Sequence, residues 1–216
     1  MDTSFLTTTE LFQGIQPEEL SALLGCVCAR ERSYLKDDVI YRAGDSVSDV
    51  GLVESGSVNI VVNHYWGGSN IFGHVRAGQI FAETYAAFPE HELLVDVVAA
   101  EDCTVLFLTL DNLLSTCSNA CAFHNRIVHN LVRISARKNL RLSSRMMHIA
   151  PKSIRERLLS YFSEQAQERG NPFSIPFSRQ QLADYLGVDR SALSNELSKM
   201  QRDGLIDYHK NDFTLL

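Results

Sequence analysis

The 216-residue sequence has no long apolar run and no basic opening, and these absences exclude two classes of protein. No stretch approaches the roughly 20 consecutive apolar residues of a membrane-spanning helix. The chain opens Met1-Asp2-Thr3-Ser4, without the positive charge that precedes the apolar core of a secretory signal. We therefore expect a cytoplasmic protein that has no membrane partner.

Cysteine is scarce, and its number is odd: the sequence has 5. A disulfide framework is not expected from such a set in a reducing compartment. Cys117, Cys121 and His124 are spaced for one face of a helix and could hold a metal, but small buried cysteines at a helix contact explain the same spacing. Cys26 and Cys28 are too few for a four-ligand iron–sulfur cluster. We expect no metal and no resident cofactor.

The residue constellations of common enzymes are also missing. No paired carboxylates and no serine–histidine arrangement stand out. His64, His74 and His91 are isolated, unlike the His-x-His of a metal-dependent roll enzyme. His74 or His91 could ligate a haem iron, but any chain with 7 histidines offers such candidates. The sequence predicts a protein that is not an enzyme.

Acidic residues are absent from 112–150, which holds 6 basic side chains, although the whole chain has a net charge of −6. Residues 1–111 hold 5 basic and 17 acidic side chains, and residues 151–216 hold 9 of each. The acidity therefore lies in the first half, and the C-terminal part can present a local positive face to nucleic acid. Non-specific DNA affinity would then be modest, and specificity would depend on base contacts.

The sequence from 178 to 200 has the pattern of two short helices joined by a sharp turn. Ser178 and Gln181 fit a capping box, Gly187 suits the left-handed residue that ends a helix, and Asp189 can cap the next one. The apolar residues at helical spacing are Leu182, Ala183, Leu186, Leu193 and Leu197. This is the helix-turn-helix pattern, whose second helix enters the DNA major groove; an ordinary helical hairpin is the alternative.

Short strand signals surround these helices. Asp203-Gly204 is a turn signal, and residues 205–208 and 213–216 read as two strands joined by a turn-rich segment. Residues 173–177 are another short strand candidate. A winged helix-turn-helix results.

The N-terminal half has a different pattern. Residues 6–24 look helical, and from 33 to about 110 short β-rich runs alternate with glycine turns, which favours a sandwich or roll. The stretch from 112 to 148 has no proline, glycine or acid and predicts one long helix. Its apolar residues Phe123, Ile127, Leu131 and Ile134 recur at three- and four-residue steps, as in a helix that pairs with a copy of itself. Packing on its own roll is the alternative.

We therefore expect an α+β protein in three segments, with a natural break at Ala150-Pro151. Residues 1–111 would form an effector-sensing β-roll with an N-terminal helix. Residues 112–149 would be a long dimerisation and connecting helix, and residues 150–216 a winged helix-turn-helix DNA-binding domain.

This order of elements resembles the Crp/Fnr superfamily of bacterial transcription regulators. In the roll the resemblance rests on residues 43–45, 55–58 and 78–83, and in the C-terminal part on 178–180, 186–187, Arg190 and 204–206. It implies a jelly-roll-like, cyclic-nucleotide-binding-like domain and a homodimer that binds a palindromic site in double-stranded DNA. It also implies a small-molecule or redox signal in the roll and contact with RNA polymerase.

The resemblance implies that bases are read from the start of the second helix. Arg190 can bind the acceptor pair of guanine, and Asn195 the acceptor and donor of adenine. Many members have Glu at the position of Ser191 and Arg at that of Asn195, so the family's usual half-site does not follow for this chain. The DNA-contacting residues would be Ser178, Arg179, Gln180, Arg190, Ser191, Ser194, Asn195 and Lys199.

Members that bind cyclic AMP hold its phosphate with a Gly-Glu-Leu turn and a later Arg-Ser pair. Here the turn is Ala82-Glu83-Thr84, and Leu93-Leu94 replaces the pair, which removes the positive partner of the phosphate. We expect that cyclic AMP does not bind. The residues at the positions of this pocket are Phe81, Ala82, Glu83, Thr84, Tyr85, Leu93 and Leu94. They could line a more apolar effector pocket, or they could simply fill the interior of the roll.

The sequence thus predicts a homodimeric, sequence-specific transcription regulator gated by an unidentified signal. The alternative is a ligand-binding roll that acts through protein contacts and carries a DNA domain that no longer reads bases. The absence of arginine at the position of Asn195 keeps this alternative open.

Overall fold

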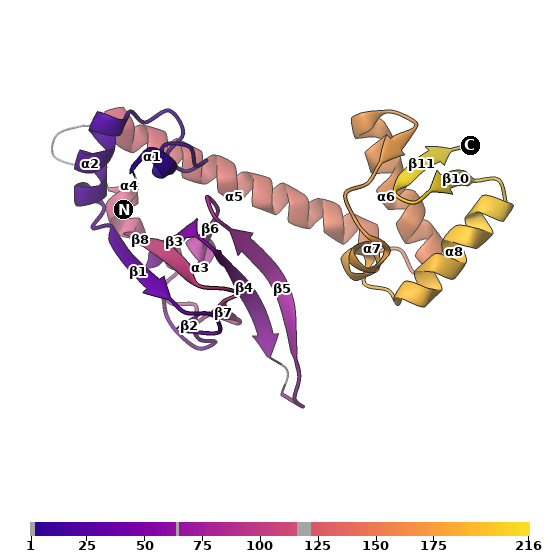
Figure 1. Ribbon diagram of the computed structural model, residues 1–216, viewed down its shortest axis with the longest axis horizontal. Coiled ribbons are helices and arrows are strands. Elements are labelled where there is room, and N and C mark those ends of the chain that lie inside the picture. Colours follow the sequence, from indigo (N-terminus) through magenta and orange to yellow (C-terminus); the bar gives the residue numbers. More distant parts are fainter. Residues whose placement is uncertain (1–2, 64, 116–121) are drawn as a thin grey trace. The chain divides into compact units, whose positions relative to one another are not determined.

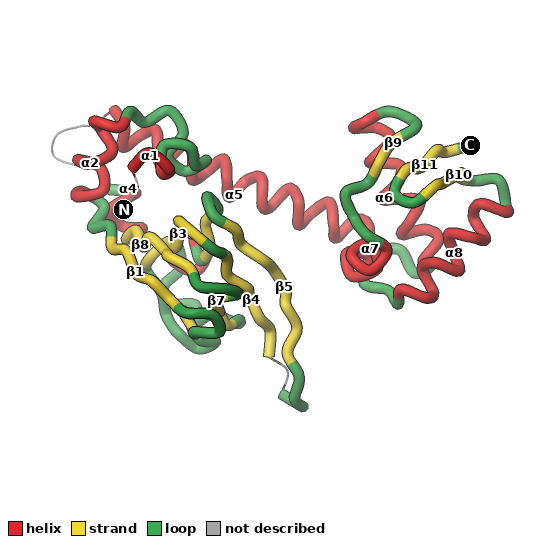
Figure 2. Tube along the Cα trace, viewed as in Figure 1, coloured by secondary structure: helices red, strands yellow, loops and turns green. Residues whose placement is uncertain are grey.

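The computed structural model describes residues 3–63, 65–115 and 122–216 (Figure 1). The chain divides into two compact units, Met1–Ala136 and Arg137–Leu216. Figure 2 shows that long strands belong to the N-terminal unit and that the C-terminal unit is mainly helical. In the described ranges, no helix combines the length and the apolar character that crossing a membrane requires.

The N-terminal unit is a β-roll built from two antiparallel sheets, with strand orders β1-β8-β3-β6 and β2-β7-β4-β5. This confirms the predicted α+β class with an N-terminal roll. The strands are β1 (Arg30–Tyr34), β2 (Val39–Tyr41), β3 (Asp49–Ser55), β4 (Ser57–Asn63), β5 (Ser69–Arg76), β6 (Ile80–Phe81), β7 (Asp96–Ala99) and β8 (Cys103–Thr109). The helices around them are α1 (Thr3–Leu6), α2 (Pro17–Cys26), α3 (Glu83–Ala86) and α4 (Leu110–Leu114).

Strand β8 is buried on both faces, which explains its continuous apolar run. Val105 and Phe107 join a core cluster drawn from both sheets, whereas Leu106 and Leu108 join a second cluster under the helices. Successive side chains of a strand point to opposite faces, so a strand covered on both sides needs apolar residues at every position.

The interior of the roll is filled by aromatic side chains. Phe81 is 2% exposed, and its ring packs edge-on against Phe107 and Tyr41, with centroids 6.4 and 6.3 Å away. It also lies against the backbone of Gly51, where an added Cβ would come within 2.3 Å of the ring. Gly51 is therefore required because the Phe81 ring approaches the chain closely.

The long helix is shorter than predicted and begins ten residues later. Residues 112–114 belong to α4, which ends at Ser115, whose backbone is extended at ψ 138°. The long helix α5 then runs from Ala122 to Ile149. The predicted helix over 6–24 is likewise divided: α1 ends at Leu6, and Pro17 opens α2. Apolar spacing alone did not reveal either break.

The first half of α5 packs into its own roll. Ile127, Leu131 and Ile134 are at most 9% exposed and lie in the core cluster beneath the helices. Asn130 donates hydrogen bonds to the carbonyls of Leu11 and Gln13, at 3.0 and 2.9 Å. The prediction that this row of side chains faces a second copy is therefore corrected, because the chain's own core covers it. The side chain of Phe123 lies outside the described part.

The C-terminal unit contains the predicted winged helix-turn-helix. Its helices are α6 (Ile154–Arg169), α7 (Arg179–Leu186) and α8 (Arg190–Arg202), and its strands β9 (Phe173–Ser174), β10 (Ile206–His209) and β11 (Asp212–Leu215) form one antiparallel sheet. Ser153 caps α6 in a capping box with Glu156. Phe162, Leu182, Leu193, Leu197 and Met200 are fully buried at the centre of this unit.

The end of α5 belongs to the C-terminal unit. His148 is buried against Tyr161, and its Nδ1 lies 3.0 Å from the hydroxyl of Tyr185. Arg145 donates to the carbonyls of Asp184 and Tyr185 at the end of α7, at 3.1 and 3.0 Å. The compact unit therefore starts at Arg137, inside α5, and includes the residues before the predicted break at Ala150-Pro151.

Candidate nucleic-acid interface

Both ends of α7 are defined by capping residues. The Ser178 side chain accepts from the backbone N–H of Gln181, whose own side chain returns to the N–H of Ser178. Gly187 ends α7 in the left-handed conformation at φ 64°, ψ 44°. Both features are confirmed as predicted: Ser178 caps the start of α7, and Gly187 ends the helix at the turn before α8.

Asp189 fixes the start of α8. Its carboxylate accepts from the backbone N–H groups of Ser191 and Ala192, and hydrogen bonds from the Ser191 hydroxyl and these amides hold the pKa of Asp189 below its usual range. An anionic cap also matches the positive end of the helix dipole. The first turn of α8 is therefore well ordered, which a helix that reads bases from its start requires.

The outward face of α8 carries polar side chains opposite its buried ones. Leu193, Leu197 and Met200 face the core, so the other side presents, among others, Ser191, Asn195, Ser198 and Arg202 at steps of four, three and four. Ser191, Asn195, Ser198 and Arg202 are exposed, and Ser194 is half-buried. This surface can donate and accept hydrogen bonds along its whole length.

Two residues predicted to contact bases have no competing partner among the residues that the structure describes. Within the described residues, the side chains of Arg190 and Asn195 make no hydrogen bond and no ion pair, and both are exposed. The other predicted contacts are engaged locally. Ser191 donates to Asp189, Ser194 donates to the carbonyl of Arg190 at 3.0 Å, Gln180 donates to Asp184 at 2.8 Å, and Lys199 pairs with Glu196 at 3.8 Å.

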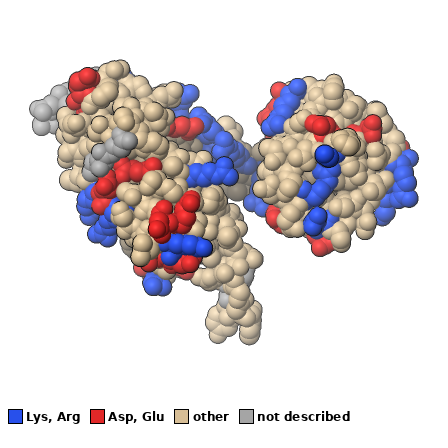
Figure 3. All heavy atoms as spheres, in the orientation of Figure 1, with Lys and Arg blue, Asp and Glu red and all other residues tan. Residues whose placement is uncertain are grey.

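Two acidic residues of α8 and its C-terminal end are paired with a basic residue of α6. Arg155 on α6 pairs with Glu196 at 2.6 Å and with Asp203 at 2.8 Å. Figure 3 shows both basic and acidic side chains on the visible face of the C-terminal unit. Residues 151–216 carry no net charge, so local basic side chains have to supply the positive charge that a phosphate backbone requires.

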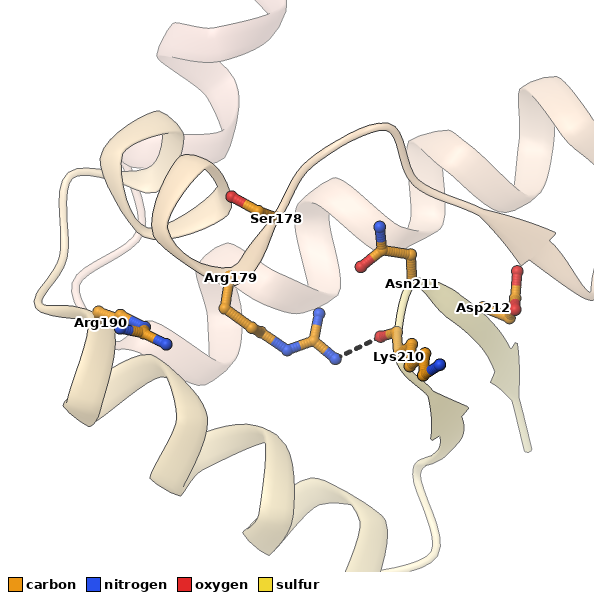
Figure 4. Close-up of a pocket in the computed structure, with 6 residues that line it drawn as sticks. All are labelled: Ser178, Arg179, Arg190, Lys210, Asn211 and Asp212. Atoms are coloured by element: carbon orange, nitrogen blue, oxygen red, sulfur yellow. Dashed lines mark hydrogen bonds between the residues drawn. The ribbon is translucent and has the colours of Figure 1, made fainter.

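A hollow of about 580 Å³ lies between the two helices and the wing, the hairpin of β10 and β11 (Figure 4). Its lining residues are Ser178, Arg179, Arg190, Lys210, Asn211 and Asp212. Of these, Ser178, Arg179 and Arg190 were predicted to contact DNA. Lys210 and Asn211, at the tip of the wing, were not predicted to contact DNA. A lysine in the turn of a predicted wing could have indicated such a contact.

Comparison with known proteins covers both units. The family model described as the cyclic nucleotide-binding domain matches residues 31–120, and the one described as the Crp-like helix-turn-helix domain matches residues 156–216. The chain belongs to the Crp/Fnr superfamily. It is a DNA-binding transcription regulator of the Crp/Fnr type with a domain of the cyclic nucleotide-binding family.

Two curated relatives are similar over most of their length. The chain is 24% identical over 196 residues to the cyclic AMP receptor protein of Thermus thermophilus, which covers 91% of this chain and 87% of the relative. It is 21% identical over 188 residues to the electron transport regulator A of Shewanella oneidensis, covering 84% of this chain and 72% of the relative.

Solved structures show the same fold. CprK complexed with OCPA has a TM-score of 0.65 at 13% identity, covering 92% of this chain and 91% of that one. The c-di-GMP-responsive regulator CLP of Xanthomonas campestris has a TM-score of 0.55 at 19% identity, covering 90% of this chain and 98% of that one. At such identities the likeness concerns the fold.

The Crp/Fnr roll of this chain does not bring all the predicted effector residues together. Phe81, Glu83 and Leu93 are buried, and Ala82 and Tyr85 are half-buried. Thr84 is exposed, and Leu94 is 78% exposed. Ala82, at φ 62°, turns the chain into α3 and so separates Phe81 from the residues that follow. The buried Phe81 fits the second of the two readings, in which these side chains fill the roll, whereas Thr84 and Leu94 are exposed.

Some of the candidate metal and haem residues have partners in the structure, and others are among the residues that it does not describe. His124 is buried, and its Nε2 lies 2.8 Å from the carbonyl of Asn112. Cys117, Cys121 and His64 are among the residues not described. His74 lies 2.8 Å from the amide oxygen of Asn59. Among the described residues, no three His, Cys, Asp or Glu side chains group as metal ligands.

Proposed function

We propose that this Crp/Fnr protein is a homodimer that reads a palindromic DNA site through α8, under the control of a signal in the β-roll other than cyclic AMP. The observation that carries the proposal is the pair of exposed, uncommitted side chains of Arg190 and Asn195 on the outward face of α8. Polar groups that can pair bidentately with base edges are what direct readout in the major groove requires.

A second row of residues on α5 supports the homodimer. Steps of four and three connect Val128, Val132, Ser135, Asn139, Leu142, Met146 and Ile149, and this row carries no charge. Val132, Leu142 and Met146 are 53–60% exposed. This is the a and d spacing of a two-stranded coiled coil, with one Asn as the polar residue that fixes register. Two-fold pairing along this row would present two copies of α8 to a palindrome.

The filled roll supports a signal other than cyclic AMP. A cyclic phosphate needs a cation or a nest of N–H donors, and the positions implied for it hold Leu93 and Leu94. Leu93 is 3% exposed, and the Phe81 ring occupies the roll interior. Calorimetric titration with cyclic AMP is expected to give no binding heat; a micromolar dissociation constant would contradict this part of the proposal.

We further infer that the regulator acts in the cytoplasm, where it contacts RNA polymerase, and that it works without a resident metal or haem. The engaged side chains of His74 and His124 support the last point. A featureless visible spectrum after aerobic and anaerobic purification is expected. A Soret band or a charge-transfer band would contradict it.

The experiment that tests the function is selection from random duplex DNA with purified full-length protein and no added effector. A recovered palindrome whose half-site centres are about one or more helical turns apart is the expected result. Enrichment only by residues 137–216 forced into a dimer would mean that the roll restrains DNA binding until a signal arrives. No enrichment by either protein would contradict the proposal and favour the ligand-binding alternative.

A further inference from the structure

Arg179 is the first residue of α7, but its side chain extends to the wing rather than outward. Its Nη2 donates to the carbonyl of Lys210 at 2.5 Å, and this bond crosses the hollow of Figure 4. Lys210 lies in the turn of the wing with a left-handed backbone at φ 52°. The guanidinium therefore binds the wing at the residue where the chain reverses direction.

The same guanidinium lies over two aromatic rings of the wing. Its central carbon is 5.1 Å from the ring centroid of Tyr208 and 5.2 Å from that of Phe213. These rings face each other across β10 and β11 at 5.5 Å, in the paired register of the two strands. A planar cation can stack on such faces and still bond a carbonyl at its edge, which a lysine ammonium cannot do simultaneously.

This environment keeps the Arg179 side chain inside the domain. Burial lowers the pKa of Arg179, opposed by Tyr208, and its Nη1 is buried without a hydrogen-bond partner in the described chain. To reach a DNA phosphate, the guanidinium would have to leave the two rings and the Lys210 carbonyl. The side chains of Arg190 and Lys210, by contrast, are exposed.

We propose that Arg179 is a positioning residue, which fixes the wing relative to α8 so that Lys210 and Arg190 meet the same stretch of DNA. This replaces the direct DNA contact predicted for it from the sequence, and it rests on the proposed DNA-binding function. Arg179 then acts on affinity through Lys210, so removing either residue should remove much of the same contribution.

The test compares R179A, R179K, K210A and the R179A/K210A double variant of the full chain on its selected DNA site. A positioning role predicts roughly tenfold weaker binding for R179A, no rescue by R179K, and a double variant close to K210A alone. A direct phosphate contact predicts rescue by R179K, a salt slope lower by about 1 in R179A, and effects of R179A and K210A that multiply. The second pattern would overturn the proposal.

R169A is the matched control, because Arg169 also donates a guanidinium N–H to a backbone carbonyl of this unit, that of Ser174, at 2.8 Å. It should leave DNA affinity unchanged. Circular dichroism checks that each variant is folded. If R179A does not fold, the comparison relies on R179K, which keeps a long cationic side chain.

Amide hydrogen exchange of the wing without DNA separates this proposal from the proposed function. Faster exchange in residues 206–215 of R179A and R179K, with α7 and α8 unchanged, is expected even if the protein selects no DNA. Unchanged exchange of the wing would overturn the positioning role, whatever the DNA experiments show.

Discussion

At the scale of single residues, some side chains of the candidate DNA interface are hydrogen-bonded within their own domain, and others have no partner in the described chain and are free to bind DNA. Ser191, Ser194, Gln180 and Arg179 are bound within the domain, whereas Arg190 and Asn195 are not bound by any described residue. A sequence pattern places all of them near DNA, because it gives position along a helix but not the competing partners. The capping residues Ser178 and Asp189 were predictable because their partners lie two or three residues away.

Alanine substitutions of Arg190 and Asn195 test whether these side chains contact bases. R190A and N195A should each weaken specific binding by about 1–3 kcal/mol and relax base preference at one position of each half-site. Fluorescence anisotropy with the selected site and single-base variants measures both effects. Q201A is the control, because the Gln201 amide donates to Asp207 and this residue was not predicted to contact DNA. Unchanged affinity and preference in both variants would remove these two residues as readers.

Gly187 carries the turn of the interface. Alanine there would have to adopt φ 64°, so G187A should lower the free energy of unfolding by about 1 kcal/mol or more. G25A is the control: Gly25 lies inside α2 with nothing within 4 Å of an added Cβ, so alanine should be neutral or stabilising by about 0.5–1 kcal/mol there. Thermal melting compares the two. If G187A melted at the same temperature as G25A, the requirement for glycine at position 187 would be contradicted.

At the scale of elements, α5 carries two apolar rows, and only one of them is covered. Ile127, Leu131 and Ile134 are in the roll's core, while Val132, Leu142 and Met146 are exposed. The sequence showed the helix, but it could not show which row the roll would cover, because both have helical spacing. The start of the helix was also missed, because no proline or glycine marks the end of α4 at Ser115.

A charge in the exposed row tests the dimer. L142E should shift the full chain from dimer to monomer, because the glutamate would lose its water at the pairing surface. Light scattering after size exclusion measures the mass. L140E is the matched control, since Leu140 is 71% exposed on the same helix but outside the row. A dimeric L142E, or a monomeric wild type, would contradict the proposed interface.

The junction of α5, α6 and α7 should make stability depend on pH. Burial lowers the pKa of His148 below 6.5, against the opposing charges of Glu164 and Glu168, so the unfolded chain binds the proton more readily than the folded one. Its contribution is complete above pH 6.5 and is lost as pH falls below 6.5 toward the folded-state pKa. Urea unfolding at several pH values should show a shallower decline in H148Q than in H129Q, which changes an exposed histidine of the same helix. Equal pH slopes in the two variants would contradict this role of His148.

At the scale of the whole molecule, the boundary between units was the least predictable feature. Proline at 151 is a sound local signal for a helix end, and α5 does end beside it. Arg145 and His148 nevertheless hydrogen-bond to Tyr185 of α7, about 40 residues later in the chain. A local sequence pattern cannot predict contacts between residues so far apart. The order of roll, long helix and winged helix-turn-helix was predictable, because each has its own periodicity.

Two fragments test this boundary. Residues 137–216 should fold independently and melt at a higher temperature than residues 150–216, because the longer fragment keeps the contacts of Arg145 and His148. Calorimetry of both fragments measures the difference. Equal melting temperatures would mean that the last turns of α5 add nothing to the unit.

The close approach of Phe81 to Gly51 has a kinetic consequence. If the signal proposed above enters the interior of the roll, it can do so only after the Phe81 ring leaves. The observed association rate of any such molecule would then rise with its concentration only to a plateau, set by the rate at which the ring departs. Its apparent affinity would be reduced by the fraction of molecules in which the ring is already displaced. Under the proposed control by such a signal, the protein would respond slowly, with a phenylalanine of its own sequence as the competitor of the signal.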